Sequence, residues 1–381
     1  MVTGIEKETL KKNNMAIQKQ EALVVKVFRF PENPLIAPDD VKPFHRGHEV
    51  IGVFNAGVAQ LNGEVLLLLR VAERPVCTDP NVVKISYIDF SSGKGKLNEM
   101  ELQKNDKRYD FSDPRMIFYS DSMHRAAYVT SLSYFRLARS KDGRNFTIDD
   151  KPFMYPETER EAWGIEDPRI TKIGASYYIQ YSAVSPEGIG VGLASTNDFK
   201  TCRRLGLIFH PENKDVAIFP EKINGKYYAL HRPVPKGIGR PEIWIAESDN
   251  LLYWGNHRHL LSLSEKGWDS CRIGGGAVPF KTDRGWLAIY HGADQNDCYS
   301  LGALLLDLND PGKMLAKTEE PILKPEADYE MNGFFGQVVF TCGALTENGT
   351  VRIYYGASDQ SIAGAEIPLE EIMEKLCKCF I

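Results

Sequence analysis

Charged, amide and aromatic side chains recur at similar points along the chain, each close to the start or end of a β-rich run. These residues are Asn55, Arg70, Asp113, Arg115, Glu166, Asp167, Arg169, Lys214, Asp215, Glu221, Lys222, His231, Arg232, Arg272, His291, Tyr299 and Asp359. Carboxylates bind sugar hydroxyls and donate protons, and lysine and arginine bind phosphate oxygens through charge-assisted hydrogen bonds. If these side chains face one pocket, it suits a polyhydroxylated, phosphate-linked substrate.

Several of these residues also have a purely structural interpretation. The segment from Glu166 to Arg169 could be a turn in which Asp167 accepts backbone N–H groups and Arg169 pairs with a neighbour. Glu221 and Lys222 could form an exposed ion pair that contributes less than about 1 kcal/mol. Spacing along the chain leaves both interpretations open beside the functional one.

Two histidines and one arginine also allow both a structural and a functional interpretation. His231 and His291 lie between aromatic and apolar neighbours, which favours buried, hydrogen-bonded histidines over metal ligands. Arg70 follows the apolar run from Val65 to Leu69, and a guanidinium at the end of an inner strand must be paired or face a ligand. The chain has no C-x-x-C, H-E-x-x-H, G-x-S-x-G or P-loop pattern, so we expect no metal site and no organic cofactor.

The elements that would position these residues follow a repeat. An apolar run, a turn such as Asn62-Gly63 or Asn224-Gly225, and a second apolar run together predict a β-hairpin. Such blocks begin near residues 54, 113, 167, 219, 275 and 338, and a period of roughly 50 to 60 residues is typical of propeller blades. Six starts allow six blades, or five with one blade shared by the two chain ends. An irregular two-sheet β protein is the alternative.

Helical periodicity is confined to the two ends of the chain. We expect a helical extension over residues 1–24, a β-propeller over residues 25–367 and a C-terminal helix over residues 368–381, with Pro368 at the first helical position. In a propeller the inner strands converge on one axial pocket, which would bring the polar residues together.

Composition narrows the classes of partner. The 381 residues carry a net charge of −5, which gives no reason to expect a nucleic-acid or acidic-membrane partner. No apolar run approaches the roughly 20 residues of a membrane span. The first 21 residues contain lysines throughout and no apolar stretch, so we do not expect a secretory signal. Seven scattered cysteines fit reduced thiols and a cytoplasmic location.

Several long segments in fixed order resemble the inverting mannoside phosphorylases of glycoside hydrolase family 130. The segments are VIGVFNAGV, EVLLLLRVAER, GIEDPRIT, ENKDVAIFPEKINGKYYALHRP, WDSCRIGGG, GWLAIYHGA, LGALLLDLNDP and YYGASD. The resemblance extends from about Asn33 to Ile367 and implies an all-β fold, a five-bladed β-propeller with short N- and C-terminal helices. RVAERP, NKDVAIFPEKINGKYYALHRP and NGFFGQVVF are most similar to the branch that acts on β-1,2-linked mannose oligosaccharides.

The resemblance also implies roles for nine residues. Asp167 matches the catalytic acid. Asn55, Arg70 and Asp359 match residues that hold the mannosyl unit to be cleaved, and His291 and Tyr299 match positions that line the same pocket. Lys214, Arg232 and Arg272 match the phosphate-binding positions. The chain departs from many relatives at Arg272, where they have lysine, and from some at Ala56, where they have a polar residue.

These roles imply cleavage of a β-mannoside, such as β-1,2-mannobiose, by inorganic phosphate, to give α-D-mannose 1-phosphate and a shortened acceptor. Phosphate is itself the nucleophile, so one acid suffices, whereas an inverting hydrolase needs a second carboxylate to activate water. A β-mannoside hydrolase would use Asp167 with Glu221 or Asp215. A phosphorylase for β-1,4-mannosyl-glucose or mannooligosaccharides and a non-catalytic sugar-binding propeller are also compatible with these residues. The resemblance also implies a homo-oligomer.

Overall fold

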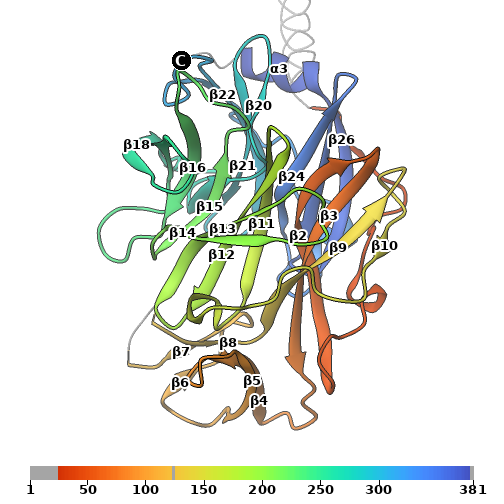
Figure 1. The fold of residues 1–381 in the computed structure, drawn as a ribbon, viewed down its shortest axis with the longest axis vertical. Coiled ribbons are helices and arrows are strands. Elements are labelled where there is room, and N and C mark those ends of the chain that lie inside the picture. Colours follow the sequence, from red (N-terminus) through yellow and green to blue (C-terminus); the bar gives the residue numbers. More distant parts are fainter. Residues whose placement is uncertain (1–24, 122–124, 378–381) are drawn as a thin grey trace, which may run out of the picture.

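The computed structural model describes residues 25–121 and 125–377, and their regular secondary structure is almost entirely β-strand (Figure 1). The predicted all-β class is therefore confirmed. The predicted N-terminal helical extension lies outside the described residues. The short helical elements are η1 (Pro38–Asp40), η2 (Glu159–Glu161), α2 (Asp328–Met331) and α3 (Leu369–Cys377). Pro368 ends the last strand, so this proline precedes α3 rather than opening it.

Five antiparallel sheets contain most of the described strands. Sheet 1 is β2 (His48–Leu61), β3 (Glu64–Pro75), β9 (Leu132–Ser140) and β10 (Thr147–Ile148). Sheet 2 is β11 (Ile165–Ile173), β12 (Ser176–Ser185), β13 (Gly188–Thr196) and β14 (Arg203–Phe209). Sheet 3 is β15 (Asn213–Ile218), β16 (Tyr227–Pro233), β17 (Ile243–Ser248) and β18 (Gly255–Leu261).

The two remaining sheets of this kind are built differently at their edges. Sheet 4 is β19 (Arg272–Gly275), β21 (Trp286–Ala293), β22 (Tyr299–Leu306) and β23 (Met314–Lys317), with β20 (Phe280–Lys281) added to β21. Sheet 5 is β24 (Val339–Glu347), β25 (Thr350–Ala357), β26 (Ser361–Pro368) and β1 (Phe28–Arg29). Because β1 pairs with β26, the two ends of the described chain share one sheet.

A small β insertion joins β3 to β9. It contains β4 (Val82–Asp89), β5 (Lys96–Gln103), β6 (Tyr109–Asp110), β7 (Met116–Tyr119) and β8 (Ala126–Val129). It has its own apolar cluster around Ile85 and Ile117. Figure 1 shows it at one end of the molecule, with α3 at the other. The block that begins near Asp113 therefore does not start a sixth large sheet.

Apolar side chains fill the spaces between neighbouring sheets. In β3, Val65, Leu67 and Leu69 pack toward sheet 5, whereas Leu66 and Leu68 pack toward sheet 2. Successive side chains of a strand point to opposite faces, so a sheet covered on both faces needs an uninterrupted apolar run. Further clusters join sheet 2 to 3, sheet 3 to 4 and sheet 4 to 5. Each of the five sheets is thus packed between two others.

Candidate active site

The first strands of sheets 1, 2 and 3 carry the same irregularity. Each has a shift in register at a polar residue with a left-handed backbone: Asn55 (φ 49°), Asp167 (φ 51°) and Asp215 (φ 56°). Asparagine and aspartate are the residues other than glycine that adopt this conformation most readily. A β-bulge redirects one side chain out of the regular alternation, so three neighbouring sheets present a polar group by the same local geometry.

The residues around the bulges fit this geometry. Pro168 lacks a backbone N–H, and it lies inside the bulge, where β11 makes no ladder bond between Glu166 and Arg169. A Cβ atom at Gly356 would overlap the side chain of Asn55, and one at Gly274 would overlap the carboxylate of Asp215. These glycines therefore leave the space that the side chains occupy.

Asp167 lies in a network shared by sheets 1 and 2. Its Oδ1 accepts hydrogen bonds from Asn55 Nδ2 and from Arg70 Nη1, each at 2.9 Å. Arg70 also donates to Glu166 Oε1 at 2.7 Å and to Ser133 Oγ at 3.1 Å. Arg70 is therefore paired, as its position at the end of an apolar run required.

The charges around Asp167 favour its ionised form. Burial by itself raises the pKa of this carboxyl, but the charges of Arg70 and Lys214 and the hydrogen bond from Asn55 outweigh burial, so the pKa is lowered. Because the charge of Lys214 acts on Asp167, this lysine of sheet 3 lies near the carboxylate. With these neighbours Asp167 is a carboxylate at neutral pH.

Asp215 lies at the equivalent bulge of sheet 3, but its partners are different. Its Oδ1 lies 3.3 Å from Arg169 Nη2, and its Oδ2 lies 3.0 Å from Arg232 Nε and 3.4 Å from His291 Nε2. Burial raises the pKa of Asp215, yet the charges of Arg232 and Arg169 hold it well below its usual range. Burial lowers the pKa of His291 to about 3, so this histidine is neutral near pH 7.

Arg169 joins three sheets. It is fully buried, and besides contacting Asp215 it donates to the backbone carbonyls of Gly275 and Gly276, at 2.5 Å and 2.7 Å. A guanidinium has five N–H donors in a rigid arrangement, so it suits several acceptors at once. The segment from Glu166 to Arg169 is therefore a bulged strand and not a turn, whereas the predicted pairing of Arg169 with a neighbour is confirmed.

Tyr299 lies in the same region, with its ring centroid 6.1 Å from that of His291. Its hydroxyl accepts a hydrogen bond from Arg272 Nη1 at 2.9 Å. Burial and the charge of Asp359 raise the pKa of Tyr299, while Arg272, Arg232 and Arg115 act in the other direction. These four charged groups, which come from sheets 3, 4 and 5 and from the insertion, thus surround one phenol.

Asp359 is the carboxyl of this site that holds its proton most tightly. It follows β25 and has a left-handed backbone. Burial is the main reason that its pKa rises to about 6; the charges of Asp167 and Glu166 add to the rise, and Arg70 opposes it. Asp167 and Asp359 are therefore neighbours with opposite shifts.

The structure brings all nine predicted site residues into this one region. Contacts or charge effects connect Asn55, Arg70, Asp167, Lys214, Arg232, Arg272, His291, Tyr299 and Asp359. Three buried polar atoms with neither a hydrogen bond nor an ion pair in the described chain also lie here: Asn55 Oδ1, His291 Nδ1 and Ser358 Oγ. Such atoms are rare in native proteins and need an explanation, of which ligand binding is one.

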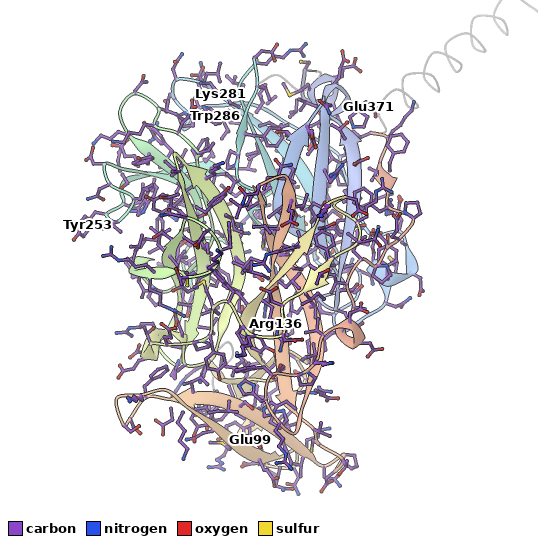
Figure 2. The ribbon with its side chains drawn as sticks, turned by 45° about the vertical axis from the view of Figure 1, so that its right-hand side comes forward. Glu99, Arg136, Tyr253, Lys281, Trp286 and Glu371 are labelled. Carbon is purple, nitrogen blue, oxygen red and sulfur yellow. The ribbon has the colours of Figure 1, made fainter. Side chains whose placement is uncertain are left out.

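Sequence reasoning was incomplete or wrong at several positions. The sequence gives no role at the site to Arg169 or Arg115, and it offers Asp215 only as an alternative base of a hydrolase. Asp215 is recognised in the structure by the β-bulge and left-handed backbone that it shares with Asn55 and Asp167. Glu221, the alternative base of a hydrolase, is exposed and bonds Lys281 Nζ at 2.7 Å. Lys281 lies at the α3 end of the molecule, opposite the insertion residue Glu99 (Figure 2). The suggestion that Glu221 activates water is therefore wrong.

The described residues contain no cluster of three or more histidine, cysteine, aspartate or glutamate side chains that could hold a metal. None of their helices has the length and apolar character needed to cross a bilayer. His231 has protein partners, since its Nδ1 lies 3.1 Å from Asn213 Nδ2 and its Nε2 lies 3.1 Å from His257 Nδ1.

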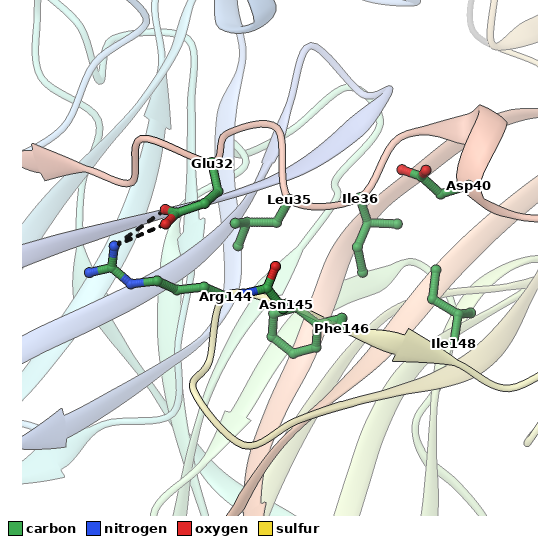
Figure 3. Close-up of a pocket in the computed structure, with 8 residues that line it drawn as sticks. All are labelled: Glu32, Leu35, Ile36, Asp40, Arg144, Asn145, Phe146 and Ile148. Carbon is green, nitrogen blue, oxygen red and sulfur yellow. Dashed lines mark hydrogen bonds and ion pairs between the residues drawn. The ribbon is translucent and has the colours of Figure 1, made fainter.

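A cavity of about 420 Å³ lies elsewhere, between the segment before β2 and the β9–β10 hairpin (Figure 3). It is lined by Glu32, Leu35, Ile36, Asp40, Arg144, Asn145, Phe146 and Ile148. An ion pair of 3.3 Å joins Arg144 to Glu32 beside it. None of the nine predicted site residues lines this cavity, so its size does not identify it as the reactive site.

Comparison with known proteins identifies the family. The family model for glycoside hydrolase family 130, described as β-1,4-mannooligosaccharide phosphorylase, matches residues 116–378. The β-1,2-mannobiose phosphorylase of Listeria innocua is 55% identical over 92% of this chain and 98% of its own length. A solved structure of the Listeria innocua enzyme with β-1,2-mannobiose matches with a TM-score of 0.91 and 54% identity, covering 93% of this chain and 99% of that one.

A second relative is the 1,2-β-oligomannan phosphorylase of a Thermoanaerobacter species. It is 44% identical over 64% of this chain and 81% of its own length. The family match covers well over half of the chain, and it agrees with the segments that carry the resemblance in the sequence. This chain belongs to glycoside hydrolase family 130.

Proposed function

We propose that this protein is an inverting β-mannoside phosphorylase. It would cleave β-1,2-linked mannobiose or mannooligosaccharides with inorganic phosphate and release α-D-mannose 1-phosphate and a shortened acceptor. The observation that carries the proposal is the position of Asp167 beside a group of lysine and arginine side chains, one of which, Lys214, already acts on its pKa. The similarity to relatives named for β-1,2-mannosides supports the linkage.

We infer that the five sheets are the blades of a five-bladed β-propeller. The cyclic packing of the sheets and the pairing of β1 with β26 support this arrangement. In a propeller the inner strands converge on the axis, which places the bulges of sheets 1, 2 and 3 around one pocket.

The two sides of the pocket would have different tasks. Asn55, Arg70 and Asp359 would hold the mannosyl unit, because amide, guanidinium and carboxyl groups bind sugar hydroxyls. Lys214 and Arg232, with Arg272 beyond them, would hold phosphate through charge-assisted hydrogen bonds. A phosphate oxygen would attack C1 from the side opposite the departing oxygen, so the configuration at C1 inverts. The C1–phosphate bond forms as the bond to the acceptor oxygen breaks.

Asp167 would supply the proton that the departing acceptor oxygen needs, through a sugar hydroxyl as the family resemblance implies. Its pKa is lowered partly by Lys214. A phosphate anion bound to Lys214 would offset that positive charge and raise the pKa of Asp167. Binding of phosphate would therefore favour the protonated acid at the moment when the acid is required.

The proposal needs no metal ion, since Lys214, Arg232 and Arg272 would supply the positive charge around the nucleophile. Its test is incubation with β-1,2- and β-1,4-mannosides, with and without phosphate, followed by an assay for mannose 1-phosphate. Mannose 1-phosphate formed from β-1,2-mannobiose is the expected result. Undiminished cleavage in phosphate-free buffer would show a hydrolase, and a preference for β-1,4-mannosides would overturn the linkage. A homo-oligomer is also expected, and light scattering tests it.

A further inference from the structure

One arginine of the insertion faces the proposed site but has no role in the mechanism above. Arg115 lies between β6 and β7, and its charge acts on both Asp359 and Tyr299. Its backbone is fixed to the segment just before β9, because the carbonyls of Pro114 and Arg115 accept hydrogen bonds from Thr130. The insertion therefore delivers a guanidinium to the wall of the site.

The surroundings of Arg115 fix the orientation of its guanidinium. Nε and Nη2 bond the carboxylate of Asp113 at 3.1 Å and 2.9 Å, and the guanidinium lies 3.8 Å from the ring centroid of Phe335. The backbone N–H of Phe335 donates to the carbonyl of Ser358, the residue before Asp359. Within the described chain Nη1 has no hydrogen-bond partner, so the N–H donors of this nitrogen can bind a ligand while Asp113 holds the rest of the guanidinium.

The position of Arg115 indicates which ligand this is. Its Nη1 group, which the carboxylate of Asp113 leaves unbonded, can donate to a neutral hydroxyl. The phosphate cations proposed above come from sheets 3 and 4, whereas Arg115 arrives from the insertion beside Asp359. An arginine–carboxylate pair stacked on an aromatic ring suits a sugar with several hydroxyl groups.

We propose that Arg115, held by Asp113 and Phe335, binds the acceptor sugar, the part of the substrate that leaves when mannose 1-phosphate forms. This inference rests on the proposed phosphorylase function. It makes the insertion between β3 and β9 a determinant of acceptor specificity.

The test compares Arg115→Ala with Arg108→Ala. Arg108 belongs to the same insertion and bonds Asp106 with the same spacing, at 3.1 Å and 2.7 Å, over the ring of Tyr109. Its side chain is 74% exposed, so its removal tests the loss of an insertion arginine as such. Both variants are assayed in the synthetic direction, with mannose as acceptor and mannose 1-phosphate as donor, and in the phosphorolytic direction, with β-1,2-mannobiose and phosphate.

We expect Arg115→Ala to raise the KM for the acceptor about 10- to 100-fold, as for a lost hydrogen bond to a charged group. The KM values for mannose 1-phosphate and phosphate should change less than about twofold, and Arg108→Ala should match wild type in all three. Arg115→Lys should recover part of the loss, since it keeps a donor but not the planar stack. A rise confined to phosphate or mannose 1-phosphate, or no change, overturns the inference.

A binding measurement separates this inference from the proposed function. If wild-type protein forms no mannose 1-phosphate from any mannoside, the proposed function fails. Calorimetric titration of β-1,2-mannobiose into Asp167→Asn protein, with and without Arg115→Ala, still reports on the acceptor contact. Weaker binding of the disaccharide in the double variant, with unchanged binding of mannose 1-phosphate, supports the contact, and equal binding of the disaccharide refutes it.

Discussion

Sheets 2 and 3 place an aspartate at the same bulge, with nearly the same backbone conformation, and surround it differently. Asp167 accepts hydrogen bonds from Asn55 and from Arg70, an arginine that also binds a second carboxylate. Asp215 contacts two arginines of its own and is almost completely buried. The same local geometry thus places Asp167 beside an arginine that it shares with Glu166, and Asp215 between two arginines that balance its charge.

The difference extends to the two sides of the site. Around Asp167 three carboxylates face one arginine: Glu166, Asp167 and Asp359 face Arg70. Three cations act on Asp215, namely Arg232, Arg169 and Lys214, and Arg272 of sheet 4 is paired separately with Asp297, which precedes β22. An excess of cations attracts an anion, and an anion bound there would raise the pKa of the neighbouring Asp167. The comparison therefore supports the proposed acid in sheet 2 and indicates a bracing carboxylate in sheet 3.

The largest expected effect is that of Asp167→Asn on turnover. Loss of a positioned general acid should lower kcat about 100- to 10,000-fold, because asparagine keeps the shape but cannot release the proton. Binding of β-1,2-mannobiose, measured by calorimetry, should stay close to wild type. A variant that retains a tenth of the wild-type rate would show that Asp167 is not the acid.

Asp215→Asn should act on the fold before it acts on chemistry. The change leaves two buried arginines without their carboxylate, and breaking a buried pair in this way costs about 3 kcal/mol or more of the free energy of unfolding. Chemical denaturation measures the loss. Glu221→Gln is the control, since that exposed pair should contribute less than about 1 kcal/mol. Equal stability of the two variants would show that Asp215 does not stabilise the fold through its two arginines.

Arg232→Ala should separate the two sides kinetically. Loss of one charge-assisted hydrogen bond should raise the KM for phosphate about 10- to 100-fold, with a smaller change in the affinity for mannobiose. Initial rates over a range of phosphate concentrations provide the measurement. If the phosphate dependence is unchanged, Arg232 does not bind phosphate, and the proposed anion site beside Asp215 is wrong.

The smallest effect concerns pH and stability. The pKa of Asp359 is raised from 3.8 to about 6, so the folded protein binds its proton more tightly than the unfolded chain. The stability that this group contributes is present below about pH 4 and is lost as the pH rises through about 6. Asp359→Asn should therefore gain stability relative to wild type between about pH 4 and about pH 8. Thermal melting at both values tests this.

Asp167→Asn should show the opposite slope. The pKa of Asp167 is lowered, so its stabilising contribution is present above the pKa of the unfolded chain and is lost as the pH falls through the folded pKa. The variant should be less stable than wild type near neutral pH, and the gap should narrow in acid. Parallel melting curves for the two variants would contradict the distinction between these aspartates.

Much of the fold was accessible from the sequence. The hairpin turns and the apolar run from Val65 to Leu69 predicted strands, because a sheet buried on both faces leaves no position for polar alternation. Blade number was not accessible in this way, since the block at Asp113 has the same local pattern as the others. That block entered the insertion because its strands pack on their own small core around Ile85.

The site was accessible in part. Resemblance selected nine residues that the structure brings together, but it gave no reason to separate Asp215 from Glu221 as partners of the acid. Spacing also left the Glu166–Arg169 segment open between a turn and a site. The bulge settles that question, because it turns Asp167 toward Arg70 while Arg169 crosses to Asp215.

The sequence by itself determined the strands, the repeat and the kinds of chemical group, because these depend on neighbours along the chain. Only the tertiary structure decided which groups meet. Asp167 and Asp215 differ through contacts with other sheets, Glu221 is placed at the surface, and Arg115 reaches the site from an insertion. Such contacts join residues far apart in the chain, and local pattern carries no information about them.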